Sequence, residues 1–300
     1  MSEDLIGFIG LGLMGGAIAR RMLRSGKRLL AFDINPSALE RLVGEGASPA
    51  RSVREVADHA GLILICLPTG GSTEVAEEAS QGQALTVYAE LSTMRPRTMG
   101  TIAKIMAERH IAVVDAPVSG GVTIAERGEL SLMMAGEREP MDRLAGAMSG
   151  VTGHVFRIGN TPGQAQLCKL VNNAIGFTLF IASCEALVTG VAGGVEPEVL
   201  LQAVNAGTGR TSWSADKFGP HVLSRTFDAG GKLGGGPRAL DLYLAEAEAV
   251  GMPAGLVQRA REVWAKIAEV LDPTKDFTTM IRYFEKFAGV ELKSPSVSPS

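Results

Sequence analysis

Short apolar runs alternate with longer segments of helical periodicity along the first half of the chain. The apolar runs span residues 5–9, 29–32, 62–67, 86–91, 111–114, 130–134 and 154–158. Helices are predicted between them at about 15–25, 36–43, 96–110 and 140–148. The run 62–67 is apolar at every position, as a central parallel strand buried on both faces should be. This alternation predicts an α/β domain with a largely parallel, doubly wound sheet.

The pattern changes after Gly159, and no further strand is predicted. Residues 164–193 contain no proline and are apolar on most helical faces, so this helix should be buried by other helices, including those of another subunit. Further helices are expected near 198–206, 240–249 and 256–270, with Trp264 in their core. We therefore expect one domain over 1–163, a second, all-helical domain over 164–292, and a disordered Ser/Pro-rich tail over 293–300.

Length and charge narrow the class of protein. Three hundred residues favour two domains, and a formal net charge of −3 with no basic block makes nucleic acid an unexpected partner. No apolar run is expected to reach the ~18 residues of a membrane span, so no membrane partner is expected. A strand begins close to residue 1, which leaves no room for a signal peptide.

The cysteines and histidines predict neither a disulfide framework nor a metal site. Cys66, Cys168 and Cys184 are odd in number and far apart, which is typical of thiols in a reducing, cytoplasmic setting. The four histidines lie scattered without ligand spacing, so we expect no metal.

The turn after the first strand carries the sequence G-x-G-x-x-G, as Gly10, Gly12 and Gly15. In a strand–turn–helix context these glycines allow a tight turn, close approach of a pyrophosphate, and close packing of the helix on the sheet. The second strand ends at Asp33, about 20 residues on, where an acid accepts hydrogen bonds from the adenosine ribose. A structural turn that binds nothing is the alternative.

Asp33 also bears on the choice of dinucleotide. Its carboxylate would repel a 2′-phosphate, and the next residue is Ile34 rather than an arginine that would accept one. The sequence therefore favours NAD over NADP in a Rossmann-type domain.

Loops that follow the predicted strands should face the ligand, because ligands of doubly wound sheets bind outside the carboxyl ends of the strands. These loops are 68–72, 92–93 and 115–121. The last one contains proline, serine and paired glycines, and is expected to be neither helix nor strand.

A lysine lies near the start of the long apolar helix. Lys169 and Asn173 share a helical face, with Asn172 beside them. The residues alone leave two readings open: a lysine that extends its amine to solvent past apolar neighbours, and a functional lysine–asparagine pair.

Three motifs together resemble the β-hydroxyacid dehydrogenase family, which includes 3-hydroxyisobutyrate dehydrogenase, tartronate semialdehyde reductase and 2-(hydroxymethyl)glutarate dehydrogenase. They are G-L-G-L-M-G from Gly10, D-A-P-V-S-G-G from Asp115 and K-L-V-N-N from Lys169, and the resemblance extends from Leu5 to about residue 290.

The resemblance implies roles for individual residues. Lys169 matches the catalytic lysine, Asn173 the asparagine that orients substrate and lysine, and Ser119 with Gly120 and Gly121 the loop that holds the substrate carboxylate. Positions that match the cofactor site are Gly10, Leu11, Gly12, Leu13, Met14, Gly15, Leu67, Pro68 and Thr93, with Ser92 beside Thr93.

The implied function is NAD-dependent oxidation of a small 3-hydroxy acid to its semialdehyde, or the reverse reduction, by a homodimer or homotetramer. A lysine partly desolvated by apolar neighbours can have a pKa lowered toward working pH, so Lys169 suits general acid/base work and no metal is needed. The alternatives are a reductase of glyoxylate or succinic semialdehyde with the same fold, and a non-catalytic dinucleotide-binding scaffold.

Two features of the second half bear on the substrate. Where the family usually has Lys-Asp near the nicotinamide, this chain has Arg238-Ala239, preceded by glycines at 230–231 and 234–236. That departure predicts either a reshaped wall of the site or a flexible loop without functional meaning. Arg210, in a loop that lines the family's substrate pocket, is expected either to pair with a second substrate carboxylate or to play a structural role.

Overall fold

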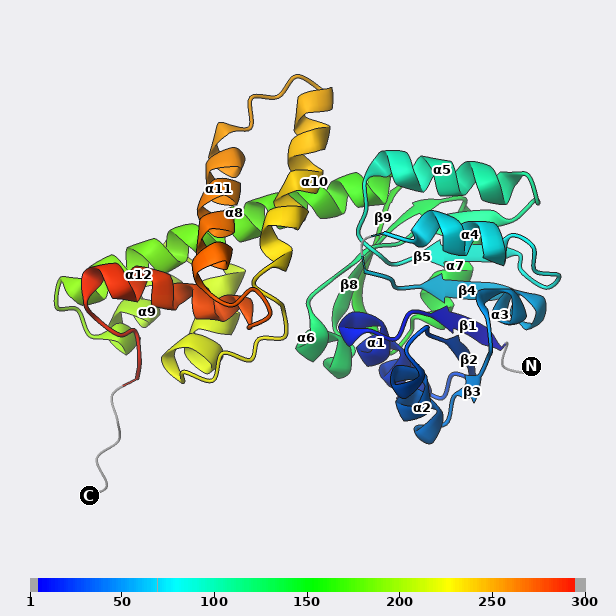
Figure 1. Ribbon diagram of the computed structural model, residues 1–300, viewed down its shortest axis with the longest axis horizontal. Helices are drawn as coiled ribbons and strands as arrows, with labels where there is room; N and C mark the ends of the chain where they lie inside the picture. Colours follow the sequence, from blue (N-terminus) through cyan, green and yellow to red (C-terminus); the bar gives the residue numbers. More distant parts are fainter. Residues whose placement is uncertain (1–4, 69, 295–300) are drawn as a thin grey trace. The chain divides into compact units, whose positions relative to one another are not determined.

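The computed structural model describes residues 5–68 and 70–294, and its elements are shown in Figure 1. The chain divides into two compact units between Lys169 and Leu170, inside one long helix. The domain bounds expected from the sequence, with a boundary at residue 163, stay a prediction. Each unit is described below by itself.

The first unit is built on a nine-stranded sheet within the described residues, in the order β3-β2-β1-β4-β5-β6-β8-β7, with β9 paired to β8. The strands from β3 to β6 are parallel, β8 runs antiparallel to β6 and β7, and β9 is parallel to β8. Strand order reverses at β1, which lies between β2 and β4 and so defines the switch point of the sheet. The strands are β1 (Ile6–Ile9), β2 (Leu29–Phe32), β3 (Ser48–Pro49), β4 (Leu62–Ile65), β5 (Val87–Glu90), β6 (Ala112–Asp115), β7 (Val118–Ser119), β8 (Leu130–Gly136) and β9 (Thr152–Gly159).

Helices cover both faces of this sheet (Figure 1). Alternate side chains of β4 enter two separate cores: Leu62 and Leu64 join one, and Ile63 and Ile65 the other. This explains why the run is apolar at every position, and it confirms the doubly wound α/β class. The helices are α1 (Leu13–Arg24), α2 (Pro36–Gly44), α3 (Val53–His59), α4 (Ser72–Ala79), α5 (Pro96–Ala107), α6 (Val122–Arg127) and α7 (Arg138–Ala147).

Several short elements were not expected from the sequence. The loop 115–121 was predicted to contain neither helix nor strand, but Val118 and Ser119 form β7 and pair with β8. Helix α3 lies in a stretch that looked merely polar. Its start carries a local signal that was overlooked, because the Ser52 side chain accepts a hydrogen bond from the Glu55 N–H as an N-cap.

The second unit is helical, and in its described residues the only β contact is an isolated bridge between Lys232 and Asp276. Phe180, Phe218 and Trp264 are among its fully buried side chains. The elements are α8 (Gln164–Ala192), which begins in the first unit, α9 (Pro197–Ala206), the π-helix η1 (Ser214–Leu223), α10 (Gly235–Ala249), α11 (Gly255–Val270), the 3-10 helix η2 (Phe277–Met280) and α12 (Ile281–Ala288). The sequence did not predict η1 or α12; η1 contains Pro220, a residue normally taken to break helices.

Helix α8 differs from the expectation in two ways. It is not buried all round, because a row of apolar side chains spaced by four residues is exposed: Leu167, Val171, Ile175 and Leu179. By length and composition alone it is also apolar enough to cross a membrane, contrary to the sequence expectation. Core helices of soluble proteins meet the same criteria, and Phe180 and Cys184 of α8 pack in the core of the second unit.

The start of the expected disordered tail is ordered. The Ser294 N–H donates to the Leu223 carbonyl at 3.0 Å, and Lys293 pairs with Glu291 at 2.8 Å. The rest of that tail, residues 295–300, lies outside the described residues.

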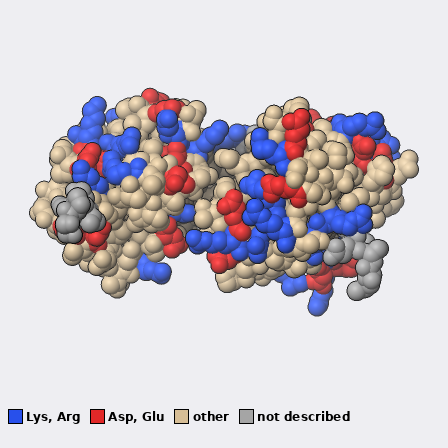
Figure 2. Space-filling view, turned by 90° about the horizontal axis from the view of Figure 1, so that it is seen from below, with Lys and Arg blue, Asp and Glu red and all other residues tan. Residues whose placement is uncertain are grey.

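On the face drawn in Figure 2, Lys and Arg side chains occur together with Asp and Glu rather than forming one uninterrupted basic surface. This matches the interspersed charges of the sequence, whose formal net charge is −3.

Candidate active site

The turn between β1 and α1 needs glycine at two positions for steric reasons. A Cβ on Gly10, whose φ is +92°, would lie 2.3 Å from the Cys66 carbonyl oxygen. A Cβ on Gly15 would lie 2.0 Å from the Gly10 carbonyl oxygen. At Gly12, by contrast, a Cβ would meet nothing within 4 Å. The protein itself does not require glycine there, so the open space suits a ligand that approaches the backbone at the start of α1.

Asp33 joins this turn to the end of β2. Its Oδ2 accepts a hydrogen bond from the Leu11 N–H at 2.5 Å, and its Oδ1 accepts one from the Asn35 N–H at 2.7 Å. A cavity of about 420 Å³ opens beside it, lined by Leu11, Gly12, Leu13, Gly16, Arg20, Asp33, Asn35, Ala38, Arg41, Leu42 and Val122. The residues present therefore fit the adenosine end of a dinucleotide.

Two arginines in this cavity were missed by the sequence reasoning, which considered only the residue next to Asp33. Ile34 is 91% exposed, whereas Arg20 and Arg41 line the cavity from α1 and α2. Arg20 is also paired with Glu126 at 3.5 Å. Helical periodicity brings both arginines back to the glycine turn. Their separation from Gly12 and Asp33 along the sequence therefore gave no sign that they line the cavity.

The loops after β4 and β5 are held together. The Leu67 N–H donates to the Ser92 Oγ at 2.8 Å, so two neighbouring segments at the carboxyl edge of the sheet are joined directly. Pro68 is exposed and Thr93 half-buried. Thr69, in the same loop, lies outside the described residues.

Ser119 ends β7 and is followed by two glycines in conformations that favour glycine. Gly120 has φ +141° and Gly121 has φ +85°, and α6 begins at the next residue. A Cβ on Gly120 would also lie 2.7 Å from the Ile124 side chain. The Gly-Gly pair therefore lets the backbone turn sharply beside the Ser119 hydroxyl.

Lys169 reaches this turn from α8. Its side chain is buried, with 9% exposure, and its Nζ donates to the Ser119 Oγ at 3.2 Å. Burial lowers the pKa of Lys169 to about 8. The amine is thus not extended to solvent, which was one of the two readings left open by the sequence.

Asn173 follows Lys169 by one helical turn on α8. The Asn172 Nδ2 lies 3.5 Å from the Asn173 Oδ1, a long contact within the helix. Asn173 is half-buried and Asn172 exposed. The roles of both asparagines stay predictions.

Two buried carboxyl groups near the site were not singled out from the sequence. Glu90 and Asp115 end the neighbouring strands β5 and β6 and are paired in register. Burial raises the pKa of Glu90 to about 7 and that of Asp115 to about 6, against the opposing effect of their hydrogen bonds. Like Asp33, each follows an apolar run in the sequence, and this position is the signal that could have identified them.

Arg210 and Arg238 lie in the second unit and are exposed: Arg210 follows α9, and Arg238 lies in the first turns of α10. Their expected roles toward substrate and cofactor stay predictions.

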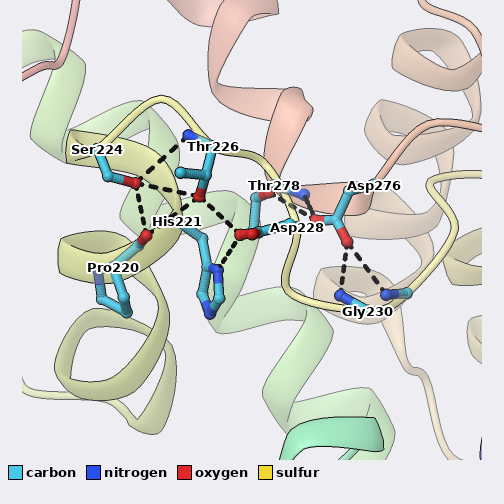
Figure 3. A network of polar contacts seen from close by, with 9 residues as sticks. Pro220, His221, Ser224, Thr226, Asp228, Gly230, Asp276 and Thr278 are labelled. Carbon is cyan, nitrogen blue, oxygen red and sulfur yellow. Dashed lines mark hydrogen bonds and ion pairs between the residues drawn. The ribbon is translucent and has the colours of Figure 1, made fainter.

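The glycine-rich segment before Arg238 is hydrogen-bonded to a distant part of the second unit, and both readings of the Arg238-Ala239 departure stay predictions. Asp276 Oδ2 accepts hydrogen bonds from the N–H groups of Gly230, at 2.7 Å, and Gly231, at 3.2 Å (Figure 3). Just before it, Asp228 accepts from Thr226 and contacts His221, each at 2.6 Å.

Trp264 fixes the next part of the same segment. Its indole N–H donates to the Leu233 carbonyl at 2.7 Å. A Cβ on Gly236 would lie 2.1 Å from the indole ring, so glycine is needed there for α10 to approach α11. Gly236 therefore serves the packing of α10 on Trp264.

Within residues 5–68 and 70–294, no group of three or more His, Cys, Asp or Glu side chains is arranged to hold a metal ion. The three cysteines are free thiols.

Comparison with known proteins identifies the family. Residues 5–159 match the family model described as the NAD binding domain of 6-phosphogluconate dehydrogenase. Residues 163–284 match the model described as NAD-binding of NADP-dependent 3-hydroxyisobutyrate dehydrogenase.

Similar proteins cover nearly the whole chain. The chain is 31% identical to 3-hydroxyisobutyrate dehydrogenase of Pseudomonas aeruginosa, over 88% of this chain and 92% of the relative. It is 28% identical to 2-(hydroxymethyl)glutarate dehydrogenase of Eubacterium barkeri, over 96% and 97%. The crystal structure of 3-hydroxyisobutyrate dehydrogenase from Salmonella typhimurium superimposes with a TM-score of 0.82 at 25% identity, over 94% of this chain and 100% of that one.

A two-domain fold with a dinucleotide turn and a buried lysine defines a class of NAD(P)-dependent oxidoreductase. The chain belongs to the β-hydroxyacid dehydrogenase family.

Proposed function

We propose that this protein oxidises a small 3-hydroxy acid to the semialdehyde with NAD, or catalyses the reverse reduction. The single observation that carries the proposal is the Lys169 amine, which is buried and donates to Ser119 in the unit that contains the dinucleotide turn. A bound nicotinamide dinucleotide supplies the acceptor or donor of the hydride. The chain would hold it through Gly10, Gly12 and Gly15 and through Asp33.

Lys169 would handle the proton of the substrate hydroxyl. Oxidation requires the neutral amine as base, and reduction requires the ammonium as acid. Because burial lowers the pKa of Lys169 to about 8, both forms are populated near neutral pH. Ser119, which accepts a hydrogen bond from this amine, would hold it in place until substrate binds.

The loop at Ser119 would bind the substrate carboxylate. The hydroxyl and the N–H groups of Gly120 and Gly121 are the type of donor cluster that suits an anion, since both glycines adopt positive φ beside the hydroxyl. Asn173, one turn after Lys169, would orient the hydroxyl group.

NAD rather than NADP is the proposed cofactor. The support is the Asp33 carboxylate in the adenosine cavity, which would repel a 2′-phosphate. Arg41 in the same cavity is the group that would favour the phosphate instead. We expect kcat/KM for NAD to exceed that for NADP about tenfold or more, a difference of roughly 1.4 kcal/mol. Asp33→Asn should lower the ratio of kcat/KM for NAD to kcat/KM for NADP, and Arg41→Gln should raise it. Equal use of both dinucleotides by the wild type would overturn the choice of NAD.

The substrate is proposed to carry a second anionic group, with Arg210 as its partner. This finer proposal rests on an exposed guanidinium in a loop after α9 and on the bidentate pairing that arginine offers to carboxylates. If Arg210→Ala leaves kcat/KM unchanged for every accepted substrate, the proposal of a second anionic group is wrong.

The test is a panel of 3-hydroxy acids offered with NAD and with NADP. It would include 3-hydroxyisobutyrate, 3-hydroxypropionate, glycerate, serine, threonate and 2-(hydroxymethyl)glutarate, with glyoxylate and succinic semialdehyde tested in the reducing direction. Formation of NADH from a hydroxy acid supports the proposal. Turnover of the aldehydes alone would assign a reductase, and NADH binding without any turnover would favour a non-catalytic scaffold.

A further inference from the structure

The start of α8 is capped by a carboxylate from a distant strand rather than by the residue before the helix. Asp115 Oδ2 accepts hydrogen bonds from the N–H groups of Gly163 at 2.7 Å, and of Ala165 and Gln166 at 3.1 Å each. The first N–H groups of a helix have no partner within it, and a cap normally comes from the preceding residue. Here the cap lies at the end of β6 and is fully buried.

Gln166 completes this attachment. Its Nε2 donates to the other Asp115 oxygen at 3.0 Å and to the Ser92 carbonyl at 2.9 Å. Its Oε1 accepts a hydrogen bond from the Met94 N–H at 2.9 Å. The side chain is fully buried, and both amide hydrogens and the amide oxygen have partners. Such a satisfied buried amide fixes the helix along its axis as well as around it.

The two attachments lie close to the proposed catalytic pair in the sequence. Lys169 follows Gln166 on α8 by less than one helical turn. Asp115 ends β6, and Ser119 ends β7, the next strand along the chain. One buried contact therefore joins the helix that carries the amine to the segment that carries the hydroxyl. A shift of α8 relative to β6 would change the 3.2 Å separation of Nζ and Oγ.

We propose that Asp115 is a positioning residue, which together with Gln166 sets how deeply the Lys169 amine is buried beside Ser119. The proposal rests on the proposed function of Lys169, but it concerns the environment of the amine and is measurable without turnover. The buried position of the amine is thus a property of the Asp115–Gln166 contact as well as of the apolar neighbours of Lys169.

Titratable groups of the neighbouring strand β5 lie beside Asp115. Glu90 on β5 lies opposite it in register, and Tyr88 donates to Glu90 at 3.2 Å. The positive end of α8 faces the carboxylate and favours its negative charge. Replacing Asp115 by asparagine keeps the shape, but its amide nitrogen cannot accept the hydrogen bond from Gln166. The helix start would then loosen, water would reach Lys169, and its pKa would rise.

The experiment uses the full-length protein with ¹³Cε-labelled lysine. The Lys169 signal is assigned by its loss in Lys169→Met, and its titration is followed by NMR in the wild type, Asp115→Asn and Gln166→Met. Leu144→Ala is the matched control, because Leu144 is a buried apolar residue of the same unit on α7 whose truncation lowers stability without removing any hydrogen bond of Asp115 or Gln166.

The expected wild-type midpoint lies near pH 8. In both network variants it should rise by about one pH unit or more, toward the ordinary lysine value. The rate of hydroxy-acid oxidation at neutral pH should fall about tenfold with it and recover at high pH. In Leu144→Ala the midpoint should stay near that of the wild type although Tm falls.

A Lys169 midpoint that does not move in either folded network variant would overturn the proposal. If Asp115→Asn does not fold, Gln166→Met decides alone, since it keeps the helix cap and removes only the side-chain attachment. A protein that turns over no hydroxy acid would contradict the proposed function, whereas the NMR titration would still test the positioning role.

Discussion

At the scale of single residues, the glycines of the β1–α1 turn separate a structural requirement from a functional one. Gly10 is needed because its φ is +92° and because a Cβ there would lie 2.3 Å from the Cys66 carbonyl oxygen. A Cβ on Gly12, in contrast, would meet nothing within 4 Å. The same motif therefore contains residues that the fold requires and one, Gly12, that the fold does not require and that we propose contacts the cofactor.

This difference makes a matched pair of variants informative. Gly10→Ala should destabilise the protein by about 1–3 kcal/mol, because the backbone is strained and the carbonyl must move. Gly12→Ala should leave the unfolding midpoint nearly unchanged while weakening NADH binding about tenfold or more. Denaturant unfolding and NADH fluorescence titration measure the two effects, and loss of stability in Gly12→Ala with intact NADH binding would contradict this assignment.

At the scale of elements, the junction between α10 and α11 depends on one glycine and not on its neighbour. A Cβ at Gly236 would contact the Trp264 indole at 2.1 Å, while one at Gly235 would lie in open space. Both residues begin α10, so they share the same helical context.

Gly236→Ala should therefore destabilise the protein by about 1–3 kcal/mol, through overpacking against Trp264. Gly235→Ala should stabilise it by about 0.4–1 kcal/mol, because alanine restricts the unfolded chain without a clash. Thermal unfolding of the two variants checks the pair. Equal effects of the same sign would mean that Trp264 does not set this junction.

The sequence predicted those elements whose formation depends on the local pattern of residues. The strand at 62–67 was predictable because both of its faces are buried in an apolar core, and the glycine turn because its sterics are local. Helix α3 was missed although Ser52 and Glu55 form a cap, since its outer face is polar.

The candidate site was less predictable, because its contacts are distant in sequence. Lys169 and Ser119 are 50 residues apart, and Asp115 and Gln166 are 51 apart. The first pair was reached only through resemblance to a family. The second was not reached at all, because a buried acid at a strand end gives no sign of which helix it caps.

At the scale of the whole molecule, α8 presents a row of exposed apolar side chains. Ile175 is 57% exposed, and Leu167, Val171 and Leu179 lie on the same face at intervals of four residues. Contiguous apolar surface of this kind usually marks an interface. We expect a second copy of the chain to cover it, in a homodimer or a homotetramer.

Ile175→Glu should then reduce the solution mass toward that of one 31.4 kDa chain. Val250→Glu is the control, because Val250 is equally apolar, 81% exposed and at the end of a different helix. Light scattering after size exclusion measures both. A wild-type protein that is already a monomer would refute the interface.

Lys169 is proposed to exchange the proton of the substrate hydroxyl, and the pH dependence of hydroxy-acid oxidation tests this role most directly. The amine of the free protein is protonated below its pKa of about 8, so kcat/KM should rise with pH through that region and level off above it. Reduction should show the opposite slope. Lys169→Ala should lose roughly 10²–10⁴-fold in kcat and lose this pH dependence, with NADH binding unchanged. A variant that keeps both the rate and the inflection near pH 8 would contradict the account.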